Sequence, residues 1–287
     1  MADLDGVSAT TLWTLRNRAL EARRPDSTFT DPLAVRMYEA IDTDFERFGT
    51  PSQSHPLRAL AVDKEINDFL DTHPDGTVVA RGLGNYSPYH LERHALAVLA
   101  VVALAEGLQT TYWRLGRPVK RWVGVDLPEV ITLREKLLPA EDAIEHIAGS
   151  ALDTSWADGI DTDSGVIITA EGLLMYLEPD EARTLIGFLA ARFPGATLVF
   201  DSIPHWFSRK TLSGLTLANG YQTPPMPYAL TYGEAEKLVE IDGVAEVGDI
   251  ALPPGRGVWK SSILRRIGDL PLVRDVRPHL LRLRFAD

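Results

Sequence analysis

The sequence contains no cysteine, which excludes disulfide bonds, thiolate zinc sites and a cysteine nucleophile. Positive charge is also in short supply, because 29 Lys and Arg residues stand against 40 Asp and Glu residues and leave a formal net charge of −11. Affinity for phosphate groups comes from clustered Lys and Arg, so this balance argues against a general binder of nucleic acid or of anionic membranes. A small molecule is a more natural partner.

Long apolar runs and common catalytic motifs are missing as well. The longest apolar run, residues 95–105, is too short to span a bilayer. The first residues, MADLDGVSATTLW, lack the basic start and apolar block of a signal peptide. We therefore expect a cytoplasmic protein without a membrane partner. The absence of a G-x-S-x-G motif, a P-loop and a kinase motif set removes the usual hydrolases and phosphotransferases.

What is present is an alternation of short apolar runs with helical segments over 287 residues, enough for a large α/β core. The expected strands lie at 101–104, 122–125, 146–151, 166–169 and 197–200, with an edge strand at 282–285. Several are followed by an acid: Asp126, Asp153, Glu171 and Asp201. In an open parallel sheet a ligand lies outside the carboxyl ends of the strands, so these acids should converge on one rim.

The stretch 101–126 has the order strand, glycine turn, helix, strand, carboxylate. Asp126 follows Gly107 by 19 positions, close to the roughly 20 expected where an acid binds a ribose hydroxyl. A glycine lets the backbone approach a ligand closely, and a carboxylate at a strand end can accept hydrogen bonds from ribose. The spacing predicts a nucleotide-type cofactor site, although Asp126 could instead cap the helix that Pro128 starts.

A repeated phrase leaves a second interpretation open. Val-Val-Ala at 78–80 recurs at 101–103, so the opening strand could be 77–80, with Gly82 and Gly84 forming the cofactor turn and 95–107 a helix. Asp126 would then follow Gly84 by 42 positions, much further than a ribose-binding acid usually does. The spacing favours the strand at 101–104 and a helical insertion before it.

Histidine and arginine clusters offer weaker candidates. His90 and His94 have the helical spacing of zinc ligands, but no third ligand is evident, and a solvated helix face explains them better. His205 could act as a general base or simply pack between its neighbours. The helical segment that starts near Ser8 or Thr10 carries a basic face formed by Arg16, Arg18, Arg23 and Arg24. This face is either solvated or forms a lid that places an arginine over an anionic ligand.

Four phrases resemble one family in their order along the chain: VSATTLWTLRNRALEARRPDSTFTDPLA, VVALAEGLQTTYWRL, RWVGVDLPEVITLR and ITAEGLLMYL. They are similar to the leucine carboxyl methyltransferase-like enzymes, which include bacterial polyketide O-methyltransferases that use S-adenosylmethionine. The resemblance implies an α/β fold with a class I Rossmann-like methyltransferase sheet. It also implies a helical cap at 1–75 and a core at 76–287, with an atypical insertion at 81–100 and a C-terminal substrate-pocket insertion at about 203–257.

The resemblance also implies the site. Asp126 would bind the ribose, Leu152 and Asp153 would border the adenine, Glu171 would lie near the methionine part, and Arg58 would meet the cofactor carboxylate. The full set of implied cofactor-binding residues is Arg58, Gly107, Asp126, Leu127, Leu152, Asp153 and Glu171.

The chain departs from the family at the turn, where the family pattern is L-G-x-G-L-D-T-R. Ala105 stands in place of a glycine, and Gln109 and Thr111 replace an acid and an arginine. A methyl group at Ala105 would crowd a backbone that must approach the ligand. The loop with Gly82 and Gly84 could supply a substitute turn.

We therefore expect an S-adenosylmethionine-dependent O-methyltransferase that acts on a carboxylate or phenol of a small molecule in secondary metabolism. A carboxylate acceptor needs no base, whereas a phenol would profit from one such as His205, and arginines of the first helix could hold an anionic acceptor. Two alternatives remain: a catalytically silent binding protein of the same fold, and a nicotinamide oxidoreductase. The sequence leaves open the acceptor, the base and whether the chain forms a homo-oligomer.

Overall fold

The computed structural model describes residue 4 and residues 6–73, 100–117, 119–160, 165–217, 219–261, 267 and 270–287. Within these residues one seven-stranded sheet has the order β3-β2-β1-β4-β5-β7-β6. Strands β1 to β5 run parallel, and β7 is antiparallel to both of its neighbours. The strands are β1 (Ala100–Leu104), β2 (Arg121–Asp126), β3 (Ile144–Ala148), β4 (Val166–Ala170), β5 (Thr197–Ser202), β6 (Val244–Asp249) and β7 (His279–Phe285). The expected Rossmann-like α/β class is confirmed.

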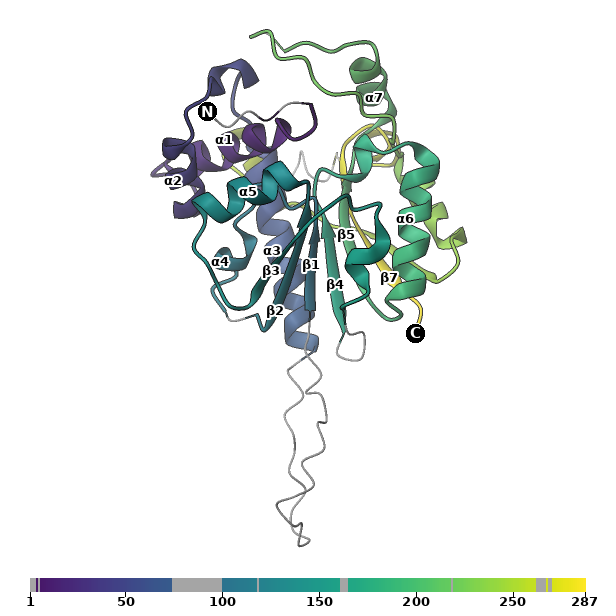
Figure 1. The fold of residues 1–287 in the computed structure, drawn as a ribbon. Coiled ribbons are helices and arrows are strands. Elements are labelled where there is room, and N and C mark those ends of the chain that lie inside the picture. The colour runs from purple at the N-terminus through teal and green to yellow at the C-terminus, as the bar shows by residue number, and fades with distance from the viewer. Residues whose placement is uncertain are drawn as a thin grey trace, which may run out of the picture.

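Helices cover this sheet and gather at one of its ends. Figure 1 shows α1 and α2 at the end of the sheet where α7 also lies, on the opposite side. The α-helices are α1 (Thr10–Ala22), α2 (Pro32–Ala40), α3 (Ser54–Thr72), α4 (Thr111–Arg114), α5 (Pro128–Leu137), α6 (Pro179–Arg192), α7 (His205–Leu212), α8 (Tyr232–Glu236) and α10 (Pro271–Arg274). The 3₁₀ helices are η1 (Phe45–Phe48), η2 (Thr154–Ala157), η3 (Leu174–Tyr176), η4 (Lys237–Glu240) and η5 (Gly257–Lys260). None of the helices in the described residues is both long and apolar enough to cross a bilayer.

Local sequence explains several helix starts. A proline occupies the first turn of α2, α5 and α6, where its missing N–H costs nothing. Asp31 caps α2 by accepting the Ala34 N–H at 2.9 Å. The sequence offers Ser8 or Thr10 as a cap for α1, but this prediction is wrong, because Ala9 occupies the cap position without a side-chain bond. Ser8 donates its hydroxyl to Glu129 instead, and Thr10 donates to the Val7 carbonyl.

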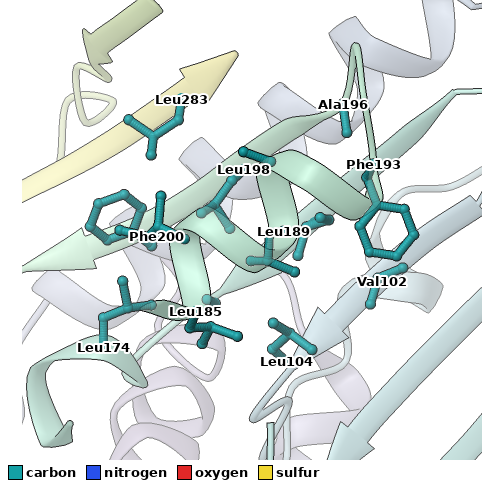
Figure 2. Close-up of a cluster of buried hydrophobic side chains, with 14 of the residues drawn as sticks. Val102, Leu104, Leu174, Leu185, Leu189, Phe193, Ala196, Leu198, Phe200 and Leu283 are labelled. Atoms are coloured by element: carbon teal, nitrogen blue, oxygen red, sulfur yellow. The ribbon is translucent and has the colours of Figure 1, made fainter. Parts of the chain in front are cut away.

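The core lies on both faces of the sheet because successive strand residues point to opposite sides. On one face, strand residues pack against α6, as Figure 2 shows for Val102, Leu104, Leu198, Phe200 and Leu283 with Leu185, Leu189 and Phe193. On the other face, α3 packs against the alternate strand residues through Val62, Ile66 and Phe69. Each fully buried side chain of this size contributes about 1.5–3 kcal/mol. The two layers therefore fix the carboxyl ends of the parallel strands.

The expected strand at 101–104 is confirmed as β1, which lies between β2 and β4. The competing helix at 95–107 is wrong where the structure describes it, because 100–104 is strand. Four other sequence features lie outside the described residues: the strand candidate at 77–80, the Gly82 and Gly84 loop, the insertion at 81–99, and His90 with His94. Ala100 itself is the first residue of β1 and not part of an insertion.

The C-terminal part of the sheet differs from expectation. The segment at 282–285 belongs to β7, which is an inner strand between β5 and β6 and not an edge strand. The edge is β6, inside the stretch expected to be a pocket insertion. Its sequence VAEVGD gives no continuous apolar run because the strand is half exposed. The strand expected at 146–151 lies slightly earlier, as β3.

Candidate functional site

A cavity of about 650 Å³ opens at the carboxyl ends of the parallel strands. The turn after β1 lines it, followed by Asp126 at the end of β2, Glu171 after β4 and Asp201 in β5. The predicted convergence of strand-end acids is therefore confirmed for these three residues. Asp153 is the exception, because it does not line the cavity, although its neighbour Leu152 does. Its carboxylate instead accepts the Ser155 N–H at 3.2 Å and caps η2.

The turn after β1 begins with an unusual backbone conformation. Ala105 has φ +50°, and no other non-glycine residue in the described part of the chain has a positive φ. Its N–H donates to the Val125 carbonyl at 2.8 Å, which ties the turn to β2. Gly107 has φ +57°, and an added Cβ would lie 3.0 Å from Thr11 Oγ1. The family's glycine positions thus keep their glycine-like conformation here, although Ala105 carries a methyl group.

Two buried arginines hold three successive carbonyl groups of this turn. Arg134 of α5 donates Nη1 to the Gly107 carbonyl at 2.6 Å and to the Gln109 carbonyl at 2.9 Å. Arg18 of α1 donates Nη2 to the Leu108 carbonyl at 2.5 Å. Both arginine side chains have 0% exposure. Bonds from charged donors are stronger than neutral ones, so the turn is fixed from two sides before any ligand binds.

Asp126 joins this turn to the end of β2. Its Oδ2 accepts the Gly107 N–H at 2.6 Å and its Oδ1 accepts the Leu127 N–H at 2.7 Å. Burial raises the pKa of Asp126 above its ordinary value, although these two N–H groups act in the opposite direction. A carboxylate offers about four acceptor positions, so roughly half remain for hydroxyl groups of a ligand.

One arginine and two carboxylates form the middle of the cavity wall. Arg58 of α3 donates Nε to Glu171 at 3.0 Å and Nη1 to Asp201. Burial alone would lower the pKa of Arg58, but the two carboxylates raise it, so the guanidinium stays charged. Burial raises the pKa of Glu171, against the effect of Arg58. With Asp126 nearby, this wall carries more negative than positive groups and suits a ligand with a cationic centre.

Gln109, which replaces the family's acid, also lies in this wall. Its amide donates Nε2 to Glu171 at 3.4 Å, while its Oε1 is buried without a hydrogen-bond partner. Thr111, which replaces the family's arginine, accepts from Arg114 at 2.9 Å. Arg114 in turn binds Asp63 of α3. The altered turn therefore has its own set of partners within the protein.

Glu106 is a buried acid in the turn that sequence reasoning missed. Its Oε1 accepts from Trp122 Nε1 at 3.1 Å and lies 2.7 Å from Arg134 Nη2, while Oε2 has no hydrogen-bond partner. Burial raises the pKa of Glu106 to about 7 despite the arginine. Gly124 faces this carboxylate, and a Cβ there would collide with Oε2. The one sequence signal was an acid within the apolar phrase LAEGL.

His55 of α3 is another cavity residue that the sequence did not reveal. Its Nδ1 lies 2.6 Å from the amide nitrogen of Asn17, which can only donate. Burial, with the nearby charges of Arg58 and Arg18, lowers the pKa of His55 to about 3. The ring is therefore neutral at ordinary pH, and its remaining proton is on Nε2.

The arginines of the first helix do not form a lid. Arg18 contacts Asp31 and the turn, and Arg16 contacts the Gly49 carbonyl and Glu46. These two side chains are buried, so only the outer pair of the basic face is solvated: Arg23 with Glu39 and Arg24 with Asp26. None of the four lines the cavity.

His205 also does not lie where a catalytic base would have to lie. Its Nε2 lies 2.6 Å from Glu234, the side chain is 44% exposed, and it does not line the cavity. The prediction that this residue could serve as a base at the site is wrong. The helix it starts contributes Trp206 and Phe207 to the cavity instead.

The half of the cavity away from Asp126 is apolar and aromatic. Met175, Ile203 and Met226 are buried together, with Tyr176 and Phe207 packed against them. All five line the cavity. Burial raises the pKa of Tyr176 to about 12, so its hydroxyl stays protonated. This half suits a flat or apolar molecule that lies beside a polar ligand at the strand ends.

Comparisons with known proteins agree with this geometry. The chain is 29% identical to the tetracenomycin polyketide synthesis O-methyltransferase TcmP of Streptomyces glaucescens, over 72% of this chain and 69% of that protein. It is 32% identical to a protein of Frankia alni whose name marks it as a proposed S-adenosyl-L-methionine-dependent methyltransferase, over 68% and 69% of the two chains.

Among solved structures, the N-methyltransferase NodS of Bradyrhizobium japonicum with S-adenosyl-L-homocysteine matches at 16% identity and a TM-score of 0.44, over 96% of this chain and 99% of that one. This likeness is too distant to bear on the chemistry. The profile of the leucine carboxyl methyltransferase family matches residues 11–190, which is more than half of the chain. The resemblance seen in the sequence is thus confirmed, and this chain is a methyltransferase that belongs to the leucine carboxyl methyltransferase family.

Proposed function

We propose that this protein transfers the methyl group of S-adenosylmethionine to a carboxylate or phenolic oxygen of a small, largely apolar molecule, in secondary metabolism. The observation that carries the proposal is that strand-end acids and an apolar, aromatic wall line one and the same cavity. S-adenosylmethionine carries a sulfonium and an ammonium group, which suit the excess of acids around Arg58. The apolar wall offers the acceptor a place next to it.

The cofactor residues implied by the family fit this arrangement to different degrees. Asp126, with acceptor positions left over, would bind ribose hydroxyls, and Leu127 and Leu152, each 38% exposed, would border the adenine. Glu171 would face the methionine part. Arg58 would meet the cofactor carboxylate only by sharing its guanidinium with the two acids that it already binds.

Methyl transfer needs alignment more than it needs reactive side chains. The acceptor oxygen and the methyl group must be held in line at near-attack distance, away from water. The fixed turn and the apolar wall would provide this alignment. A carboxylate acceptor would react without a base, because it is ionised at neutral pH.

Calorimetric titration with S-adenosylmethionine tests the proposal first. We expect binding by the unaltered chain and a loss of roughly 10- to 100-fold in Asp126→Ala, since a hydrogen bond to a charged group contributes about 1.5–3 kcal/mol. Asp158→Asn, an exposed acid away from the cavity, is the matched control and should bind normally. Equal affinity of Asp126→Ala and the unaltered chain would contradict the proposed ribose contact.

A second candidate is a binding protein that keeps the cofactor but transfers no methyl group. The methyl of Ala105 in the turn is the observation that favours it. A methyl-transfer assay with aromatic alcohols and acids separates the two, because a silent protein would bind the cofactor and give no product. Binding of NAD in place of S-adenosylmethionine would point to the nicotinamide alternative.

A further inference from the structure

A histidine in the first turn of α3 presents a hydrogen-bond donor to the cavity. His55 lines the cavity and is only partly buried. Its Nε2 makes no hydrogen bond to a described residue, yet this atom is not closed off by its neighbours. A polar atom in this situation is available to a ligand group. Neither the cofactor contacts nor the methyl transfer proposed above uses it.

Hydrogen bonds on the other side of the ring fix the position of its proton. The Ser52 N–H donates to Asn17 Oδ1 at 3.3 Å, so the amide of Asn17 turns its nitrogen toward His55. An amide nitrogen only donates, so His55 Nδ1, which lies 2.6 Å away, must accept. Burial, with the charges of Arg58 and Arg18, lowers the pKa of His55 to about 3, so the ring carries one proton. That proton is on Nε2, which can therefore donate and cannot accept.

The place of His55 along α3 separates it from the groups that would hold the cofactor. Arg58 lies three residues later on the same helix face, where it binds Glu171 and Asp201 at the carboxyl ends of the strands. Later residues of α3 pack against the sheet itself. His55 is therefore nearly one helical turn, roughly 4.5 Å, further out from the strand ends than Arg58. On that outer side it meets α1, whose Trp13 packs edge-on against its ring with 5.7 Å between the ring centroids.

The surroundings of this donor indicate which ligand group it would bind. Trp13 lines the cavity beside His55, and Tyr176 and Phe207 belong to the apolar wall of the same cavity, which favours a flat aromatic molecule. The group that pairs with Nε2 must accept a hydrogen bond. A carboxylate there would call for a charged partner, but Arg58 is already bound by two acids. A ring ketone accepts the bond without bringing a charge or a proton that needs a partner of its own.

We propose that His55 donates a hydrogen bond from Nε2 to a ring ketone of the methyl acceptor, and thereby selects flat aromatic ketones over the same ring systems without the ketone. The bond holds the ring system at a point apart from the oxygen that receives the methyl group. His55 determines specificity here and takes no proton. An ammonium or N–H group at this place would meet a second donor and is disfavoured. This inference rests on the proposed function, because it concerns the acceptor of that reaction.

Calorimetry with S-adenosylmethionine separates this inference from the proposed function. The unaltered chain and His55→Asn should bind the cofactor with equal affinity. In this variant the shorter amide can still accept from Asn17, but it does not reach the place of Nε2. If the unaltered chain does not bind the cofactor, the proposed function fails, and this inference fails with it. If only His55→Asn loses binding, His55 belongs to the cofactor site, which overturns this inference alone.

Two matched pairs of flat ligands measure the selection by calorimetry with S-adenosylhomocysteine present. The members of the pair 2-hydroxy-9-fluorenone and 2-hydroxyfluorene differ only in the ketone, as do the corresponding 2-carboxylic acids. We expect the unaltered chain to bind the ketone of at least one pair about fivefold more tightly. His55→Asn should lose this preference, and His55→Gln, whose amide nitrogen reaches the place of Nε2, should retain part of it. His205→Asn removes an exposed histidine outside the cavity and should keep it in full.

Three results would overturn the proposal. The unaltered chain could bind the cofactor and show no preference in either pair, which includes the case in which it binds none of the four ligands. His55→Asn could keep the full preference for the ketone. His55→Asn and His55→Gln could also lose affinity equally for both members of a pair, which would mark a structural role of the ring.

Discussion

Replacing Ala105 with glycine should both stabilise the protein and tighten cofactor binding. Ala105 is the first residue after β1, has φ +50° and lines the cavity. An L-residue in this left-handed region places its Cβ too close to the following carbonyl oxygen. Glycine removes that contact and also removes the methyl group between the backbone and the ligand.

The size of the effect follows from two opposing contributions. Relief of the left-handed conformation is worth about 1–2 kcal/mol. The greater freedom of glycine in the unfolded chain subtracts about 0.4–1 kcal/mol. A net gain of about 0.5–1 kcal/mol in the free energy of unfolding remains, which corresponds to roughly 1–2 °C in Tm for a chain of this length. For cofactor affinity we expect a gain of about fivefold, or roughly 1 kcal/mol.

Urea denaturation and calorimetric titration with S-adenosylmethionine measure the two effects. Ala151→Gly is the matched control, because Ala151 also lines the cavity but does not have a positive φ. That variant should lose about 0.5–1 kcal/mol of stability. If Ala105→Gly is destabilised by as much as Ala151→Gly, the conformation of Ala105 is not strained. Unchanged affinity would show that its methyl group does not obstruct the cofactor.

Three further predictions concern buried charges near the turn. Arg134→Met removes two hydrogen bonds to turn carbonyls and leaves Glu106 without its counter-ion, so urea denaturation at pH 8 should show a loss of about 3–5 kcal/mol in the free energy of unfolding. A loss below about 1 kcal/mol would show that the turn is stable without Arg134. The pKa of Glu106 is about 7 in the folded protein against 4.5 in the unfolded chain, so between these pH values the folded state binds one more proton. The free energy of unfolding should therefore fall as the pH rises from about 4.5 to 7, by at most about 3 kcal/mol. The variant Glu106→Gln should flatten this part of the stability profile, and an unchanged slope would assign it to other groups. The effect of His55 on stability has the opposite pH dependence, because its pKa is about 3 in the folded protein and 6.5 in the unfolded chain. The free energy of unfolding should therefore fall as the pH decreases from about 6.5 towards 3. In the same measurement, His55→Asn should reduce this loss of stability in acid.

Much of the sheet could be predicted because its parallel strands are buried on both faces. Such strands are continuous apolar runs, as in AVVAL of β1 and VIITA of β4, and each stands out from its flanks. The edge strand β6 could not be found in the same way, since only its first residue is buried and the exposed residues that follow interrupt the apolar pattern. The position of β7 inside the sheet depends on pairing with β5 and β6, which no local pattern encodes.

The candidate site could be predicted where a single residue at the end of a strand identifies it. Asp126 was found from its spacing to Gly107, and the two residues do bond to each other. The arginines that hold the turn were not found, because their partners are backbone carbonyls that leave no trace in a sequence. The cavity residue His279 of β7 and its neighbour Asp249 of β6 were missed for a related reason, because their side chains approach each other only where β6 pairs with β7.

The order of the last two strands has a consequence for how the protein is made. In the sheet β6 borders β7, and β7 comes later in the chain. During synthesis β6 leaves the ribosome before the strand that it pairs with, and it has nowhere to dock until β7 emerges and settles against β5. Since the start of β7 also supplies His279 and Leu280 to the cavity lining, this part of the cavity is the last to take shape. A nascent chain could thus fold its parallel strands early and still lack this part of the cavity wall.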